Sequence, residues 1–151
     1  MYTTVLTIHS WARWLALVAG VGATMAAMRG KVEGTNSLAD RWGLFAMMAL
    51  DIQMLLGLIL YFVLSPFTAE ALKDFSAAMK SSELRYWAVE HIFVMVAAVI
   101  LAHVGRVLAR RAPTTAAKRT RLLVCFGLAT VLMFLRTPWP GLPNGRPLFR
   151  L

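Results

Sequence analysis

The stretch LFAMMALDIQMLLGLILYFVL, residues 44–64, decides the fold class, because it is long enough to cross a membrane as one helix. A spanning helix needs about 20 predominantly apolar residues. Only Asp51 and Gln53 place strongly polar side chains in this run. Three further apolar runs lie at 5–28, 84–108 and 120–136. None alternates as a membrane β-barrel requires, so we expect an all-α bundle of four transmembrane helices in up-down order.

The composition of the whole chain agrees with a membrane protein. Hydrophobic residues make up 59% of the 151 residues, and the mean hydropathy is +0.65. A soluble domain is about 45–50% apolar, so the composition excludes an ordinary soluble globule. The single cysteine, Cys125, excludes a disulfide-stapled secreted module and is expected to pack as a small hydrophobe. The length suits one membrane domain covering 1–151.

Two segments outside the spans have their own character. Residues 65–83 begin with Ser65 and Pro66, a good helix start, and continue with apolar side chains at every fourth position. This pattern predicts an amphipathic helix lying in the membrane interface between the second and third spans. The proline-rich tail, PWPGLPNGRPLFRL at 138–151, is expected to lie extended against one end of the bundle. The apolar part of the fourth run, 122–135, is short at about 21 Å of helix, so flanking arginines are expected to snorkel outward.

The basic residues predict the orientation in the membrane. The net charge is +9, from 16 Lys and Arg against 7 Asp and Glu. Nine basic residues lie in or beside the first and third connections: Arg29, Lys31, Arg41, Arg106, Arg110, Arg111, Lys118, Arg119 and Arg121. The positive-inside rule places these connections in the cytoplasm and both termini outside a bacterial cytoplasmic membrane. The charge is thereby explained without nucleic-acid binding. The N-terminus lacks a basic region before its apolar run, so a cleaved signal peptide is not expected.

Two histidines form the strongest candidate site. His9 and His91 lie near the outer ends of the first and third spans, at depths that agree within about 5–10 Å. These spans are diagonal neighbours in an up-down bundle. Two imidazoles in this arrangement suit the axial ligation of a b-type haem. Stripes of small residues follow each histidine, and Met95 lies one turn after His91. The alternative is that the stripes serve packing and both histidines form hydrogen bonds near the interface.

The other intramembrane polar residues leave several roles open. Arg13 can pair with Glu90 or with a haem propionate, and Glu90 can instead fix the tautomer of a ligating imidazole or form a plain ion pair. Asp51 and His103 lie at similar depth, so we expect Asp51 to be buried and paired with His103; a proton path or quinone contact is the alternative. Gln53 points away from Asp51, so one of the two faces the bundle interior. His103 is rotated by about 120° from His91, which argues against a second haem.

Remaining features do not point to other chemistry. The five tryptophans fall near span boundaries and are expected to serve as aromatic-belt anchors. A copper site at the two histidines with Met95 lacks a supporting MxxM or cysteine cluster. No phosphate-binding glycine loop and no paired nucleophile and base occur in the sequence.

Several motifs together resemble a family of small four-helix bacterial membrane proteins loosely labelled cytochrome-b-like. They are HSWARW at 9–14, DIQMLLGLILYF at 51–62, RYWAVEH at 85–91, HVGR at 103–106, and PWP with GRPLFR in the tail. The resemblance implies the four-helix fold and a haem. It carries over His9 and His91 as ligands, and Gln53, Glu90 and Arg106 as site or packing residues.

The sequence as a whole favours electron transfer through one b haem held by His9 and His91, with a quinone as a plausible partner. A cofactor-free accessory subunit of a respiratory or photosynthetic membrane complex is the alternative. In that case the polar residues bind other helices, other subunits or a second copy of the chain.

Overall fold

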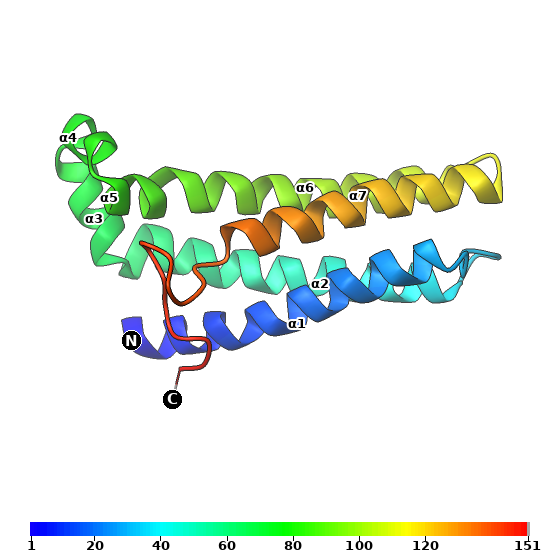
Figure 1. The fold of residues 1–151 in the computed structure, drawn as a ribbon, viewed down its shortest axis with the longest axis horizontal. Coiled ribbons are helices and arrows are strands. Elements are labelled where there is room, and N and C mark those ends of the chain that lie inside the picture. Colours follow the sequence, from blue (N-terminus) through cyan, green and yellow to red (C-terminus); the bar gives the residue numbers. More distant parts are fainter. Residues whose placement is uncertain (151) are drawn as a thin grey trace.

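The computed structural model describes residues 1–150, and Leu151, the last residue of the predicted domain and tail, lies outside the described residues. The described chain is helical and contains no strand, which confirms the all-α prediction. Four long helices, α1 (Tyr2–Met28), α2 (Leu38–Ile59), α6 (His91–Arg110) and α7 (Thr115–Arg136), run antiparallel in succession (Figure 1). Each packs on two neighbours in the ring α1–α2–α6–α7, so α1 and α6 are diagonal, as predicted.

Three helical segments are long and apolar enough to cross a membrane: Tyr2–Met28, Leu38–Leu64 and Ser82–Arg110. The second combines α2 with the π-helical turn η1 (Leu60–Leu64), and the third combines α5 (Ser82–Arg85), η2 (Tyr86–Glu90) and α6. α7 has 22 residues, longer than the apolar run that we expected. The added N-terminal turns carry Lys118, Arg119 and Arg121 and are therefore polar.

Small side chains fill the interior of the bundle and large apolar side chains cover its outside. Fully buried alanines such as Ala19, Ala46 and Ala98 lie where the long helices meet. Leu15, Leu55 and Phe93 are instead 60%, 60% and 74% exposed. Lipid-facing helices show this distribution, because the bilayer accepts apolar surface and close helix packing needs small residues. The packing therefore agrees with the composition.

The two ends of the bundle differ. The loop end holds the connections 29–37 and 111–114, and the terminal end holds both termini, α3 (Pro66–Lys73), α4 (Phe75–Lys80) and α5 (Figure 1). Residues 65–83 form these short helices, so the prediction of one amphipathic helix is wrong in detail. Asp74 and Ser81 are the reason, because both leave helical geometry and cap the next helix with their side chains.

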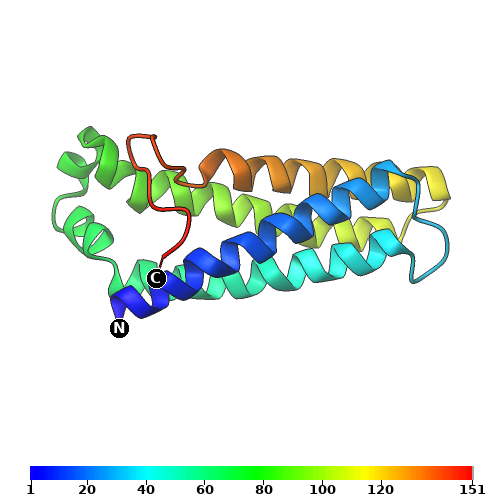
Figure 2. The ribbon, with the colours of Figure 1, turned by 60° about the horizontal axis from the view of Figure 1, so that its bottom comes forward.

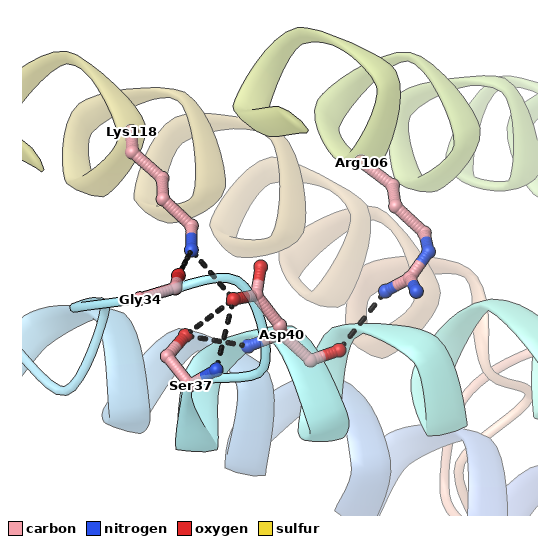
Figure 3. Close-up of polar contacts among 5 residues, drawn as sticks. All are labelled: Gly34, Ser37, Asp40, Arg106 and Lys118. Carbon is pink, nitrogen blue, oxygen red and sulfur yellow. Dashed lines mark hydrogen bonds and ion pairs between the residues drawn. The ribbon is translucent and has the colours of Figure 1, made fainter. Parts of the chain in front are cut away.

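The loop end is held together by charged side chains that bind across helices. Figure 3 shows Lys118 of α7 reaching Asp40 and the Gly34 carbonyl, and Arg106 of α6 donating to the Asp40 carbonyl at 2.9 Å. Asp40 also completes a capping box with Ser37 at the start of α2. Several basic residues of this end therefore have structural partners.

The tail folds back over the terminal end in a series of turns (Figure 2). The indole nitrogen of Trp14 and the guanidinium of Arg13 donate to the Leu148 carbonyl at 3.1 and 2.8 Å. Trp11 donates to the Arg150 carbonyl at 2.9 Å. The tail thus lies against the bundle as expected, although turns at its prolines and glycines replace the extended path that we predicted.

Candidate functional site

A cavity of about 140 Å³ lies inside the terminal end, between α1, α2, α6, α7 and the tail. About 10–15 Å³ of such volume holds one water molecule, so the cavity has room for roughly ten. Most of the exposed wall area is apolar, but about half of the lining residues carry polar or charged groups, including two histidines and three arginines. The two π-helical turns flank it, and the hydroxyl of Tyr61 in η1 ties them together by donating to the Ala88 carbonyl at 2.8 Å. π-helical turns often occur at functional sites.

His91 lines the cavity with one ring nitrogen already engaged. Its Nδ1 lies 3.0 Å from the Arg136 carbonyl oxygen. Because a carbonyl only accepts, Nδ1 carries the hydrogen and Nε2 keeps a free lone pair. The ring also packs between Tyr86 and Trp87, with centroid distances of 5.8 and 5.7 Å. The imidazole is therefore held in one tautomer and one orientation, as metal-ligating histidines commonly are.

His9 faces the same cavity from α1, the helix diagonal to α6. Its Nε2 lies 3.3 Å from the amide nitrogen of Gln53 on α2. Its Nδ1 is buried and has no partner among the described residues. Gly57 makes room for the ring, because a Cβ at that position would lie 3.3 Å from His9 Cε1. The predicted pair of histidines thus comes together at one cavity.

Buried polar atoms without a protein partner gather at this cavity. Within residues 1–150 the structure contains five such side-chain atoms: His9 Nδ1, Arg13 Nε, Gln53 Oε1, Trp87 Nε1 and Arg150 Nε. All five residues line the cavity. A buried polar group that lacks a hydrogen bond destabilises a fold by about 1–3 kcal/mol. Their concentration at one place is what a site that binds a polar or charged group would show.

Three arginines are among the residues that line the cavity. The guanidinium of Arg146 lies 5.1 Å from the ring centroids of both Phe67 and Trp87, and 3.8 Å from Glu83. Arg13 and Arg150 complete the set. Arg13 binds the tail and does not pair with Glu90. These arginines therefore offer positive charge to the acidic groups of a ligand in the cavity.

Glu90 lies beside the cavity and does not line it. Its carboxylate accepts from Arg85 at 2.9 Å and from Arg136 at 3.1 Å. Arg136 supplies the carbonyl that holds His91, so Glu90 supports the histidine indirectly. Met95 and Gln53 line the cavity as candidates, whereas Arg106 belongs to the loop end.

Asp51 and His103 lie apart from the cavity, on the outer surface of α2 and α6. The predicted pairing is present, with Asp51 Oδ1 and His103 Nε2 3.5 Å apart. The predicted burial is wrong, because the two side chains are 44% and 45% exposed. Gln53 occupies the interior face of α2. Residues two positions apart on a helix are rotated by about 200° about the helix axis, so Asp51 must point outward.

Sequence reasoning missed the tail residues Arg146 and Arg150 and the role of Trp87, which we expected only as an interface anchor. The indole of Trp87 lines the cavity with an unpartnered N–H. No pattern in the sequence links the tail to α1, since more than 130 residues separate the hydrogen-bonded groups.

The chain matches no protein-family model, and no curated protein or solved structure is significantly similar to it. The described residues contain no group of three or more His, Cys, Asp or Glu side chains placed to hold a metal ion.

Proposed function

We propose that this protein is a small b-type cytochrome of the bacterial cytoplasmic membrane, which carries electrons through one haem between His9 and His91. The observation behind the proposal is that imidazoles from two diagonal helices line one cavity where the chain's unpartnered buried polar atoms gather. Two histidine side chains are a sufficient donor set for haem iron, so a third protein ligand is not needed.

The lining of the cavity suits a flat apolar group with acidic substituents. Much of its wall is apolar, and its lining includes Arg13, Arg146 and Arg150, which could bind propionate groups. At about 140 Å³ the cavity is smaller than the roughly 300–1,000 Å³ of small-molecule sites, so a haem would need the side chains around it to move. Met95 and Met133 also line the cavity, and their flexible side chains can move to admit a larger group.

Gln53 is a positioning residue in this proposal. Its amide nitrogen now faces His9 Nε2, which leaves the hydrogen of the imidazole on Nδ1. If the amide turns over, Gln53 Oε1 accepts a hydrogen bond from Nε2–H, and Nδ1 becomes a free lone pair. This rotation of the amide also gives Gln53 Oε1, which has no partner in the structure, a hydrogen-bond donor. Gln53 thus selects whether His9 donates a hydrogen bond into the cavity or offers a ligand nitrogen.

The haem would supply a one-electron redox centre, and the surrounding residues would set its environment. The apolar part of the wall would limit contact of the haem with water, and the lining arginines would add positive charge. Electrons would exchange at the terminal end, where a quinone dissolved in the membrane is the plausible partner. The proposed topology has four spans, including α7, with both termini outside. The basic residues at the loop end support this orientation.

Visible absorption of the purified, dithionite-reduced protein tests the proposal. Wild-type protein should show the α-band of a low-spin b haem. His9→Ala and His91→Ala should each abolish it. His103→Ala is the matched control, because it removes the third histidine, which lies outside the cavity, and should leave the band unchanged. Gln53→Leu should weaken the haem signal or change its position.

A colourless wild-type protein from haem-replete cells would refute the proposal. It would favour the alternative, a cofactor-free accessory subunit whose polar residues bind other helices or subunits. Loss of the band in His103→Ala with an unchanged melting temperature would contradict the assignment of the two ligands.

A further inference from the structure

An acid–base pair lies on the outside of the apolar bundle, halfway along a membrane-spanning helix. Asp51 is 13 residues from each end of the segment Leu38–Leu64, about 20 Å along the helix from either end. Its carboxylate faces His103 of α6, and both side chains are nearly half exposed. The side chains around the pair are large and apolar, among them Met48, Leu55 and Ile100.

Asp51 has no hydrogen bond within the described part of one chain, and its contact with His103 is long. The 3.5 Å between Asp51 Oδ1 and His103 Nε2 exceeds the 2.7–3.2 Å range of a good hydrogen bond. His103 Nδ1 has its own acceptor, the Val99 carbonyl at 3.0 Å, so Nδ1 carries a hydrogen. Polar groups at this depth are costly when they face lipid, and they normally point to protein. A second protein surface is therefore needed against this face.

We infer that this face, formed by Asp51 with its neighbours on α2 and His103 with its neighbours on α6, binds a second copy of the same chain. The inference requires that the bundle spans the membrane, as under Proposed function, but it does not require haem. A two-fold axis along the membrane normal preserves the depth of every residue. Asp51 and His103 lie at one depth, so the axis places Asp51 of one copy opposite His103 of the other.

The chain is therefore self-complementary at this face. An occupant must present a polar partner for the imidazole Nε2 and a donor for the carboxylate at the same depth, between apolar side chains. A second copy does so without any further requirement. The four side chains then form a ring in which each acid contacts a histidine of either chain, and the flanking apolar side chains pack around it.

The antiparallel course of α2 and α6 predicts which apolar residues meet. Met48 lies three residues before Asp51, and Val107 lies four residues after His103, so both lie about 5 Å from the pair toward the loop end. Met48 of one copy should therefore face Val107 of the other. Both side chains are exposed, at 52% and 49%.

Disulfide cross-linking between two differently tagged copies tests this register in membranes. Both copies carry Cys125→Ala, which removes the native thiol. Met48→Cys in one copy and Val107→Cys in the other should cross-link on mild oxidation, much more than two copies that both carry Met48→Cys. Leu15→Cys with Val131→Cys is the control on α1 and α7, where the side chains are equally exposed, and should not cross-link.

The mass of the protein in lipid nanodiscs gives the second measurement. Wild-type protein should be a dimer, and Asp51→Leu should weaken dimerisation about tenfold, since each copy loses one polar contact. The exchanged double variant Asp51→His with His103→Asp should restore the dimer. That rescue distinguishes a direct contact from a folding defect, which thermal melting reports separately.

A monomeric mass without the Met48–Val107 cross-link would overturn the inference. Cross-linking of the control pair to the same extent would also overturn it, because the contact would then be non-specific. Protection of this face by a different polypeptide would identify another occupant and exclude the two-fold dimer. Release of the protein from membranes by carbonate would instead refute the membrane placement, independently of any haem spectrum.

Discussion

Asp40 is expected to be the most sensitive single residue of the loop end. Its carboxylate accepts from the Ser37 backbone at 3.0 Å, from the Ser37 hydroxyl at 2.6 Å and from Lys118. The side chains of Asp40 and Lys118 are each only 13% exposed. The pair joins the start of α2 to the start of α7, and Lys118 also binds the Gly34 carbonyl at 2.7 Å (Figure 3).

Asp40→Ala should lower the free energy of unfolding by about 3 kcal/mol. Removing one partner of a buried ion pair destabilises by about 3–5 kcal/mol. About 0.5–2 kcal/mol of that loss comes from the broken capping box at the start of α2, which is part of the same figure. We place the loss near the lower end of the range of about 3–5 kcal/mol, because Lys118 still donates a hydrogen bond to the Gly34 carbonyl. Asp40→Asn should lose only about 1–2 kcal/mol, since the amide oxygen still accepts the capping hydrogen bonds.

Unfolding in mixed micelles, followed by circular dichroism, measures these differences. Lys118→Met completes a double-mutant cycle with Asp40→Ala, and we expect a coupling energy of at least about 1 kcal/mol between them. If the protein binds haem as proposed, its absorption spectrum should stay unchanged in these variants, because the cavity lies at the opposite end of the bundle. A loss below about 0.5 kcal/mol for Asp40→Ala, or additive single effects, would refute the reasoning.

Three further predictions address the tail, the packing of α6 on α7 and the orientation in the membrane. Arg13→Met removes a hydrogen bond to the tail worth about 1 kcal/mol, so amide exchange in the tail should rise several-fold, and unchanged exchange would contradict the docking. Gly105→Ala should destabilise by about 1–3 kcal/mol, because a Cβ there would overlap a side chain of α7. Gly127→Ala, where the nearest atom would be 3.8 Å away, should be neutral or stabilising, and equal melting temperatures for the two variants would exclude this explanation. In a chain without Cys125, a cysteine replacing Thr115 should resist an impermeant reagent in intact cells and one replacing Leu142 should react, whereas the reverse would mean an inverted topology.

Amino-acid type and spacing determined the helices of this protein, because they depend on local properties. Apolar runs of about 20 residues predict spanning helices whatever their neighbours do. The capping box of Ser37 and Asp40 starts α2 at Leu38, six residues before the apolar run that we expected. The order of four long helices with short connections then makes α1 and α6 diagonal, which is how sequence reasoning anticipated that His9 and His91 meet. The break at Asp74 was missed because an unbroken apolar period hid a good capping residue.

Tertiary structure alone decided which side of each helix faces inward. Gln53 and Asp51 are equally plausible as interior residues by periodicity, and only the packing of α2 against α1 and α6 turns Gln53 to the cavity and Asp51 to the outside. The same holds for the tail, because its contacts with α1 join residues far apart in the chain. Local propensity carries no information about such contacts. These contacts depend on how all the helices pack together. The contribution of Arg146 and Arg150 to the cavity could therefore be seen only in the folded chain.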